Sequence, residues 1–192
     1  MDNTFVKTVL WKEIFFLFLI AYVLGFFLRT KFFKKLKKAE EQFFSGQWDG
    51  LYRVCKNLRE SPLVSINAIW NPHYKNIQSA LCAMCASIAY CEGNIALFLS
   101  DLQYAKPDLH TGQKEILLAL YFQSIGEYSQ AVVFYNAYQQ VSHKDSSAET
   151  VFQYIFSEQK ESFDLEHVRY VIRNIQNPAL RKLIAANGVL VD

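Results

Sequence analysis

The feature that most constrains this chain is an apolar run near its amino end that leads directly into a basic cluster. Residues 14–28 contain no charged side chain, and most of them are Phe, Leu, Ile or Val. Fifteen helical residues are about 22 Å long, short of the ~30 Å hydrocarbon core of a bilayer. Extending the segment to residues 9–28 encloses Lys12 and Glu13 near one end, where long side chains reach the headgroups. We therefore predict a transmembrane anchor over residues 9–28, after a short exterior segment of residues 1–8.

Two other interpretations of the apolar run remain open. Runs of this length also occur in helices buried in a protein core, and apolar segments close to the N-terminus also occur in cleaved signal peptides. A signal peptide is disfavoured because the four charged residues before the run sum to zero and because the run ends in Phe-Phe-Leu-Arg-Thr-Lys, without small residues for cleavage. A helix lying on the membrane surface would need a polar face, which residues 14–28 lack. The membrane span is the interpretation that we adopt.

The basic cluster after the run predicts which way the anchor points. Lys and Arg residues close to a span are retained on the cytoplasmic side. Residues 29–38 carry six positive charges and no negative one, whereas only two Lys residues precede the run. We expect an exterior N-terminus, a cytoplasmic C-terminal domain, and a basic juxtamembrane helix over residues 29–45 that contacts anionic lipid headgroups, at about 1 kcal/mol per basic residue. Six side chains, which we call the basic collar, are expected to make these contacts: Arg29, Lys31, Lys34, Lys35, Lys37 and Lys38.

The rest of the chain is mildly acidic. Residues 39–192 contain 12 Lys and Arg against 16 Asp and Glu, so the overall charge of +2 comes from the basic collar. Binding to a phosphate backbone needs Lys and Arg clustered on one face, so we expect no nucleic-acid partner. The length is sufficient for one domain with its own hydrophobic core, which we predict over residues 46–192.

Helices are the only regular structure that the sequence predicts. All four prolines fall between apolar-periodic segments, and alternating β-branched runs with hairpin turns are missing. The helix of the anchor is expected to continue to about Phe44, and residues 61–73 are expected to be irregular. The other expected helices cover about residues 48–60, 74–91, 94–105, 113–125, 127–141, 146–160, 164–176 and 178–186, the last ending at Asn187-Gly188.

Two short turns are spaced like the turns of a helical repeat. Gly126-Glu127-Tyr128 joins two predicted helices, and Gly93-Asn94-Ile95 lies 33 residues earlier. Small and aromatic residues accompany the second turn where hairpin helices would pack closely: Ala119, Phe122, Ala131 and Tyr135. This pattern resembles the tetratricopeptide repeat (TPR) over residues 39–178, and best over residues 113–140. Together with the predicted span, the resemblance implies an all-α protein in which a single N-terminal transmembrane helix is followed by a short α-solenoid of TPR-like helical hairpins. An unrelated all-α bundle is the alternative.

Cys82-Ala-Met-Cys85 is the one pattern with potential chemistry, since Cys-x-x-Cys occurs in redox pairs and in zinc sites. A zinc site would need a second such pair or paired histidines, and the four histidines lie singly in the sequence. A redox pair of the thioredoxin type lies at a strand-to-helix junction, whereas this one lies within a predicted helix. We therefore interpret both cysteines as core residues. No motif for catalysis or phosphate binding occurs, so we expect no enzyme, no cofactor, no metal and no small-molecule substrate.

The TPR resemblance implies a groove for a partner. In such hairpins the first helix of each pair lines a concave surface that accepts an extended or helical segment. The groove residues that it implies here are Ser87, Tyr90, Gln113, Ile116, Leu120, Gln123 and Ser124. These side chains are uncharged, so the expected ligand is an apolar or amphipathic segment of a protein. The same positions equally fit packing against the next hairpin, which would leave no open groove.

A second candidate contact lies in the stretch that is predicted to be irregular. Residues 62–72 are unusually apolar for a loop, and they include Ile66, Ile69 and Trp70. These three side chains either fold back as a plug of the core or stay exposed to a protein partner or to the bilayer.

Together these features favour a single-pass, membrane-anchored adaptor or scaffold that recruits a protein partner through a cytosolic helical-repeat domain. The main alternative is a structural subunit of a larger membrane complex, for secretion, import or envelope assembly, with no free ligand groove. A thiol redox protein that uses Cys82 and Cys85 is a weaker third hypothesis.

Overall fold

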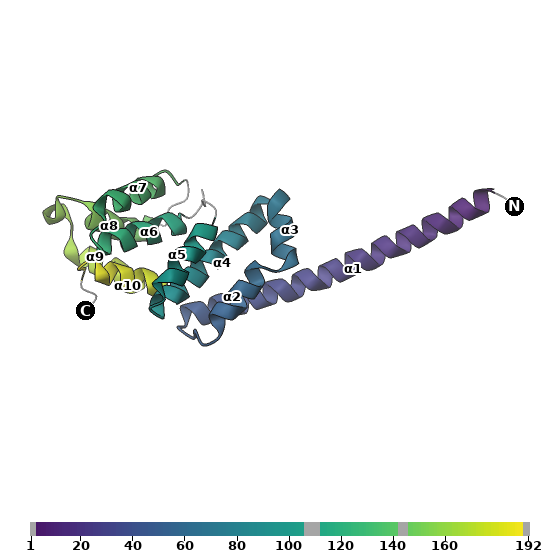
Figure 1. Cartoon of the computed structure of the whole chain (residues 1–192), viewed down its shortest axis with the longest axis horizontal. Coiled ribbons are helices and arrows are strands. Elements are labelled where there is room, and N and C mark those ends of the chain that lie inside the picture. Colours follow the sequence, from purple (N-terminus) through teal and green to yellow (C-terminus); the bar gives the residue numbers. More distant parts are fainter. Residues whose placement is uncertain (1–2, 106–111, 142–145, 190–192) are drawn as a thin grey trace. The chain divides into compact units, whose positions relative to one another are not determined.

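The computed structural model describes the backbone of residues 3–105, 112–141 and 146–189, and over these ranges its regular structure is all helical. Side chains are described within the same ranges from Phe16 onward, apart from the first two residues of the third range. The chain divides into two units, Met1–Lys38 and Ala39–Asp192. The all-α fold class is therefore confirmed, and Figure 1 shows the order of the helices.

Helix α1 (Asn3–Phe44) carries the apolar run without interruption. Every apolar side chain from Phe16 to Leu28 is exposed, that of Tyr22 to 75%, so these residues do not behave as a buried core helix. One helix of the described residues is long and apolar enough to cross a membrane, with a span of Phe16–Phe44 and a mean hydropathy of 1.8. A signal sequence meets the same criteria of length and composition. The orientation and the cytoplasmic domain therefore stay predictions.

Helix α1 ends where the sequence predicts, in a glycine turn. Gly46 has a left-handed φ of 76°, a conformation that glycine adopts without steric cost. The N–H of Gly46 donates to the carbonyl of Phe43 at 3.2 Å, and the N–H of Gln47 donates to that of Gln42 at 3.0 Å. These bonds satisfy the last carbonyls of the helix, so the chain is free to reverse.

The stretch that was expected to be irregular, residues 61–73, is largely helical, and that prediction is wrong. Helix α2 (Leu51–Arg59) is followed by α3 (Pro62–Trp70) and then by α4 (Pro72–Cys91). A proline opens both α3 and α4. At the first helical position proline gives up no hydrogen bond and already has a helical φ, so it starts a helix as readily as it ends one.

Helix α4 is the centre of the domain. All its residues from Leu81 to Tyr90 are buried, so this part of the helix is covered on every side. It contacts α2, α3, α5 (Ile95–Tyr104), α6 (Gln113–Ser124) and α10 (Pro178–Ala186). Elements from both ends of the domain therefore pack against α4.

Two glycine turns close two helical hairpins, 33 residues apart. Gly93 lies between α4 and α5, and Gly126 lies between α6 and α7 (Tyr128–Gln139). Both glycines are left-handed, with φ of 80° and 83°. The residue after each glycine donates its N–H to the carbonyl five residues earlier, Asn94 to Ala89 at 2.8 Å and Glu127 to Phe122 at 2.9 Å. The two turns thus repeat the same geometry at the spacing found in the sequence.

A third pair of helices follows. Helix α8 (Ser146–Phe156) ends four residues before the predicted boundary, and a 3-10 turn, η1 (Lys160–Ser162), leads to α9 (Leu165–Asn174). Helices α8 and α9 contact each other. Stacked rings join this pair to α7, because the ring centroids of Tyr135 and Phe156 are 4.1 Å apart and the interplanar angle is 10°.

The last helix, α10, returns to the middle of the domain. Its N-cap is Asn177, whose side chain accepts hydrogen bonds from the N–H groups of Ala179 and Leu180, and the helix ends before Asn187-Gly188 as predicted. Its contacts are with α4 and α6, which lie far from it in the sequence. This long-range packing concerns the predicted groove directly, because α4 and α6 are the helices expected to line it.

Candidate protein-binding surfaces

The two helices expected to line the groove, α4 and α6, contact each other, and α10 packs against both. On α10 the side chains of Leu183 and Ile184 are fully buried. They belong to the same hydrophobic cluster as Tyr90 of α4 and Leu120 of α6. The chain therefore packs one of its own helices against both helices that were predicted to line the groove.

Polar contacts fix the position of α10 along that surface. Lys182 Nζ donates to the backbone carbonyl of Cys91 at 3.2 Å and lies 5.5 Å from the ring centroid of Tyr90. Asn187 Nδ2 donates to the backbone carbonyl of Leu120 at 3.0 Å. One contact reaches α4 and the other reaches α6, so the helix is held at both of its neighbours.

The predicted groove residues differ in their exposure. Ser87, Tyr90, Ile116 and Leu120 are buried, Gln123 and Ser124 are half-buried, and Gln113 is exposed. The four buried residues are not exposed to a partner, and α10 and the residue that follows it make polar contacts at two of them, Tyr90 and Leu120. The helix itself was predicted, but the sequence gives no sign of which distant helices it contacts.

The second candidate contact is a helix face and not a loop. Ile66, Ile69 and Trp70 lie on α3 at i, i+3 and i+4 and are 59%, 61% and 83% exposed. The other side of α3 is packed, since Val64 and Ala68 are buried. Helix α3 contains no charged residue. We call these three exposed side chains the α3 face.

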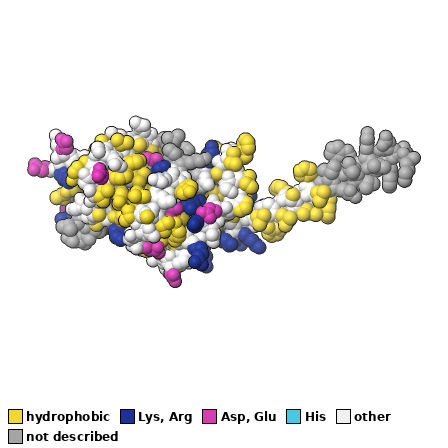
Figure 2. All heavy atoms as spheres, in the orientation of Figure 1, with side chains coloured by type: hydrophobic (Ala, Val, Ile, Leu, Met, Phe, Trp, Pro, Cys, Tyr) yellow, Lys and Arg dark blue, Asp and Glu magenta, His cyan; other side chains and the backbone are white. Residues whose placement is uncertain are grey.

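Helix α7 offers an apolar surface that the sequence analysis missed. Only Ala131 and Tyr138 of this helix are buried. Four exposed apolar side chains, which we call the α7 face, lie on α7 and the turn before it: Ile125, Tyr128, Val132 and Val133. Figure 2 shows hydrophobic side chains gathered where Figure 1 draws α6 and α7. The sequence does contain a signal, because residues 128–140 include no Asp, Glu, Lys or Arg.

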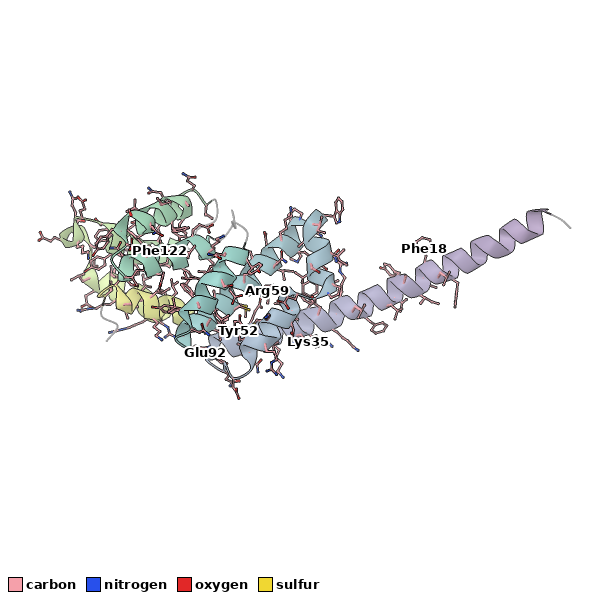
Figure 3. The ribbon with its side chains drawn as sticks, in the orientation of Figure 1. Phe18, Lys35, Tyr52, Arg59, Glu92 and Phe122 are labelled. Carbon is pink, nitrogen blue, oxygen red and sulfur yellow. The ribbon has the colours of Figure 1, made fainter. Side chains whose placement is uncertain are left out.

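A buried ion pair holds α2 against the α4–α5 hairpin. Arg59 Nη1 lies 2.6 Å from Asp101 Oδ1, and the two residues are only 9% and 3% exposed. The Tyr52 hydroxyl donates to the other carboxylate oxygen of Asp101 at 2.9 Å. Figure 3 labels Tyr52 and Arg59, which both come from α2, whereas Asp101 comes from α5. Nothing in the sequence marks this cluster, because its members are up to 49 positions apart.

The cysteines behave as core residues in the structure. Cys55, Cys82 and Cys85 are buried free thiols, and Cys91 is half-buried. Burial raises the pKa of the Cys82 thiol, and a hydrogen bond with Cys55 together with burial raises the pKa of Cys85. Cys82 and Cys85 are therefore held as buried, protonated thiols, which are poor nucleophiles and poor metal ligands. The described residues contain no group of three or more His, Cys, Asp or Glu side chains that could hold a metal ion.

The phenol of Tyr52 should titrate at unusually high pH. Burial and the hydrogen bond to Asp101 raise its pKa from 10.0 to about 12. The neutral phenol therefore stabilises the folded state fully below about pH 10, and this contribution is lost as the pH rises towards 12. We expect Tyr52→Phe to remove a late step from the tyrosinate absorbance titration of the folded protein. If Tyr52→Phe instead removed a step near pH 10, the raised pKa of Tyr52 would be contradicted.

The basic collar lies on α1, where Figure 3 labels Lys35. All six of its side chains are exposed in the first unit.

Comparisons of the chain with protein-family models, with curated proteins and with solved structures find no match. The function therefore has to be argued from the surfaces described above.

Proposed function

We propose that this protein is a membrane-anchored adaptor or scaffold, in which α1 holds a helical-hairpin domain at a membrane and the domain recruits a protein partner. The observation that carries the proposal is the α7 face, an exposed apolar surface on a helix without charged residues. Contiguous exposed apolar side chains on a soluble domain are typical of interaction sites. The proposed activity is binding, with no substrate turned over.

The proposal includes a TPR-like arrangement of the hairpins. It is supported by the same glycine turn at Gly93 and Gly126, and by the contact of α4 with α6, the first helices of two successive pairs. In stacked hairpins the second helix of each pair forms the outer surface, which is where α7 would lie. Recruitment through α7 is therefore proposed in place of recruitment through the predicted groove, because α10 packs against both helices expected to line that groove.

The chemistry of the α7 face indicates its partner. The exposed side chains of Tyr128, Val132 and Val133 are surrounded on the helix by neutral Ser, Gln and Asn residues. Cores of protein interfaces are depleted of charge and enriched in tyrosine. We therefore propose a protein partner with an apolar, uncharged contact surface, bound on the cytoplasmic side of the membrane. The cytoplasmic side is proposed because the basic collar follows the apolar run.

Substitution of Val133 by aspartate tests the proposal. A photo-crosslinking amino acid at the exposed position Ser129 should capture the partner in cells, and Val133→Asp should lower the yield about tenfold or more, because binding would bury an unpaired charge. Ala96→Asp is the matched control, since it adds the same charge at an exposed position on another helix, α5. Equal capture by both variants would exclude the α7 face as the contact.

A structural subunit of a larger membrane complex is the second candidate. The observation that favours it is the packing of α10 against α4 and α6, the helices predicted to line the groove. The two candidates differ in whether a bound neighbour exchanges with free protein. A recruited partner should exchange with added, differently labelled partner after membranes are solubilised, whereas neighbours in a permanent complex should not.

A further inference from the structure

The α3 face differs from other exposed apolar side chains because it joins a tryptophan to two isoleucines on one helix turn. Trp70 is 83% exposed, and Ile66 and Ile69 are each about three-fifths exposed. No charge interrupts α3, and the first charged residue after it is the exposed Lys75 in α4. Tryptophan is enriched at the membrane–water interface because its ring is apolar while its N–H stays hydrated. The composition of this face therefore matches an interfacial helix.

The area of the α3 face favours a lipid surface over a protein. A stable protein interface buries roughly 800 Å² on each partner, which needs about 20–30 residues. The three exposed side chains supply only a small part of that area, and α2, which contacts α3, exposes the charged Arg53 and Lys56 beside the apolar Val54. Shallow insertion into the headgroup region needs only a few apolar side chains, and nearby positive charges are attracted to anionic lipids.

The length of the tether allows this contact. Helix α1 continues 16 residues beyond Leu28, which is about 24 Å at 1.5 Å per residue. Helix α4 has 20 residues and is about 30 Å long, so the domain is at least as large as this tether is long. A face on the domain that meets the bilayer would do so at the high local concentration that the anchor imposes.

We infer that the α3 face inserts into the headgroup region of the same bilayer that holds α1, as a second and shallow membrane contact. The occupant of this face is lipid, and no partner protein is involved. The contact leaves the α7 face free, and it stands independently of whether the protein recruits a partner. It depends on the membrane span of α1 and on the exposure of three side chains.

Tryptophan fluorescence in reconstituted vesicles tests this inference. The chain has three tryptophans, so the full-length Trp11→Phe/Trp48→Phe variant keeps Trp70 as its only reporter. Vesicles of phosphatidylcholine and phosphatidylserine are prepared with and without bromine on the acyl chains close to the headgroup. We expect brominated lipid to remove most of the Trp70 fluorescence, the emission to lie at shorter wavelength than that of a hydrated indole, and acrylamide in the water to quench it weakly.

Two further variants keep the test decisive. Trp11→Phe/Trp70→Phe leaves Trp48, which is half-buried in the domain, and this reporter should be insensitive to brominated lipid. Adding Ile66→Ser and Ile69→Ser to the Trp70 reporter changes only exposed positions, so the circular dichroism should be unchanged while the lipid quenching falls. A hydrated Trp70 in vesicles would overturn the inference. So would a Trp70 that is protected from acrylamide without quenching by lipid, because that result indicates contact with a second copy of the protein.

Discussion

Replacing Asp101 with alanine is expected to destabilise the domain by about 3–5 kcal/mol, because it leaves the guanidinium of Arg59 buried without its counter-charge. The same change removes the acceptor of the Tyr52 hydroxyl. A typical domain is stable by only about 5–15 kcal/mol, so this is a large fraction of the total. Denaturant unfolding of the full-length protein in detergent micelles, followed by circular dichroism, measures the change in the free energy of unfolding.

Glu60 provides a matched control, because it contacts the same arginine from the surface. Its carboxylate lies 3.3 Å from Arg59 Nη2, but its side chain is 55% exposed. Glu60→Ala should therefore cost no more than about 1 kcal/mol. Replacing both Arg59 and Asp101 by apolar residues should recover most of the stability lost with Asp101→Ala, since no unpaired charge then remains. A double variant as unstable as the single one would show that packing, and not the unpaired charge, sets the cost.

The parts of the fold that depend on neighbouring residues could be predicted from the sequence. The all-helical class, the end of α1 near Phe44, and the turns at Gly93, Gly126 and Gly188 all follow from local patterns, because a left-handed glycine ends a helix wherever it lies. Helix α3 was missed for an equally local reason. Proline at the first turn of a helix and proline as a helix breaker look the same in a sequence, and only the flanking structure separates them.

The candidate surfaces could be predicted only in part, because they depend on packing between distant residues. The exposure of the α3 face was one of two alternatives that the sequence left open, and the structure supports exposure. The cluster of Tyr52, Arg59 and Asp101 has no sequence signature. The α7 face could have been found, because an uncharged stretch over residues 128–140 in a chain with 20% charged residues indicates an unusual environment.

The groove shows most clearly what a sequence pattern leaves undetermined. The TPR resemblance assigned Tyr90, Ile116 and Leu120 to a face of the first helices, and all three lie in one cluster in the structure. That cluster also contains Leu183 and Ile184 of α10. A face suited to an amphipathic helix binds the helix that is available, and here a helix of the same chain is available without the entropic cost of association.

Leu183→Ala should therefore act as a core substitution and not as the loosening of a peripheral segment. Leu183 is fully buried on α10, which packs against α4 and α6, so truncation should lower the free energy of unfolding by about 2–5 kcal/mol. Arg181→Ala on the same helix changes an exposed position and should stay within about 0.5 kcal/mol of the parent protein. Native-state hydrogen exchange distinguishes a core helix from a separable peripheral helix, because a core helix and the helices it contacts lose protection together. If only the amides of α10 exchanged faster while those of α4 and α6 kept their protection, α10 would be a separable occupant, and the surface carrying Tyr90 and Leu120 would again be open to a partner.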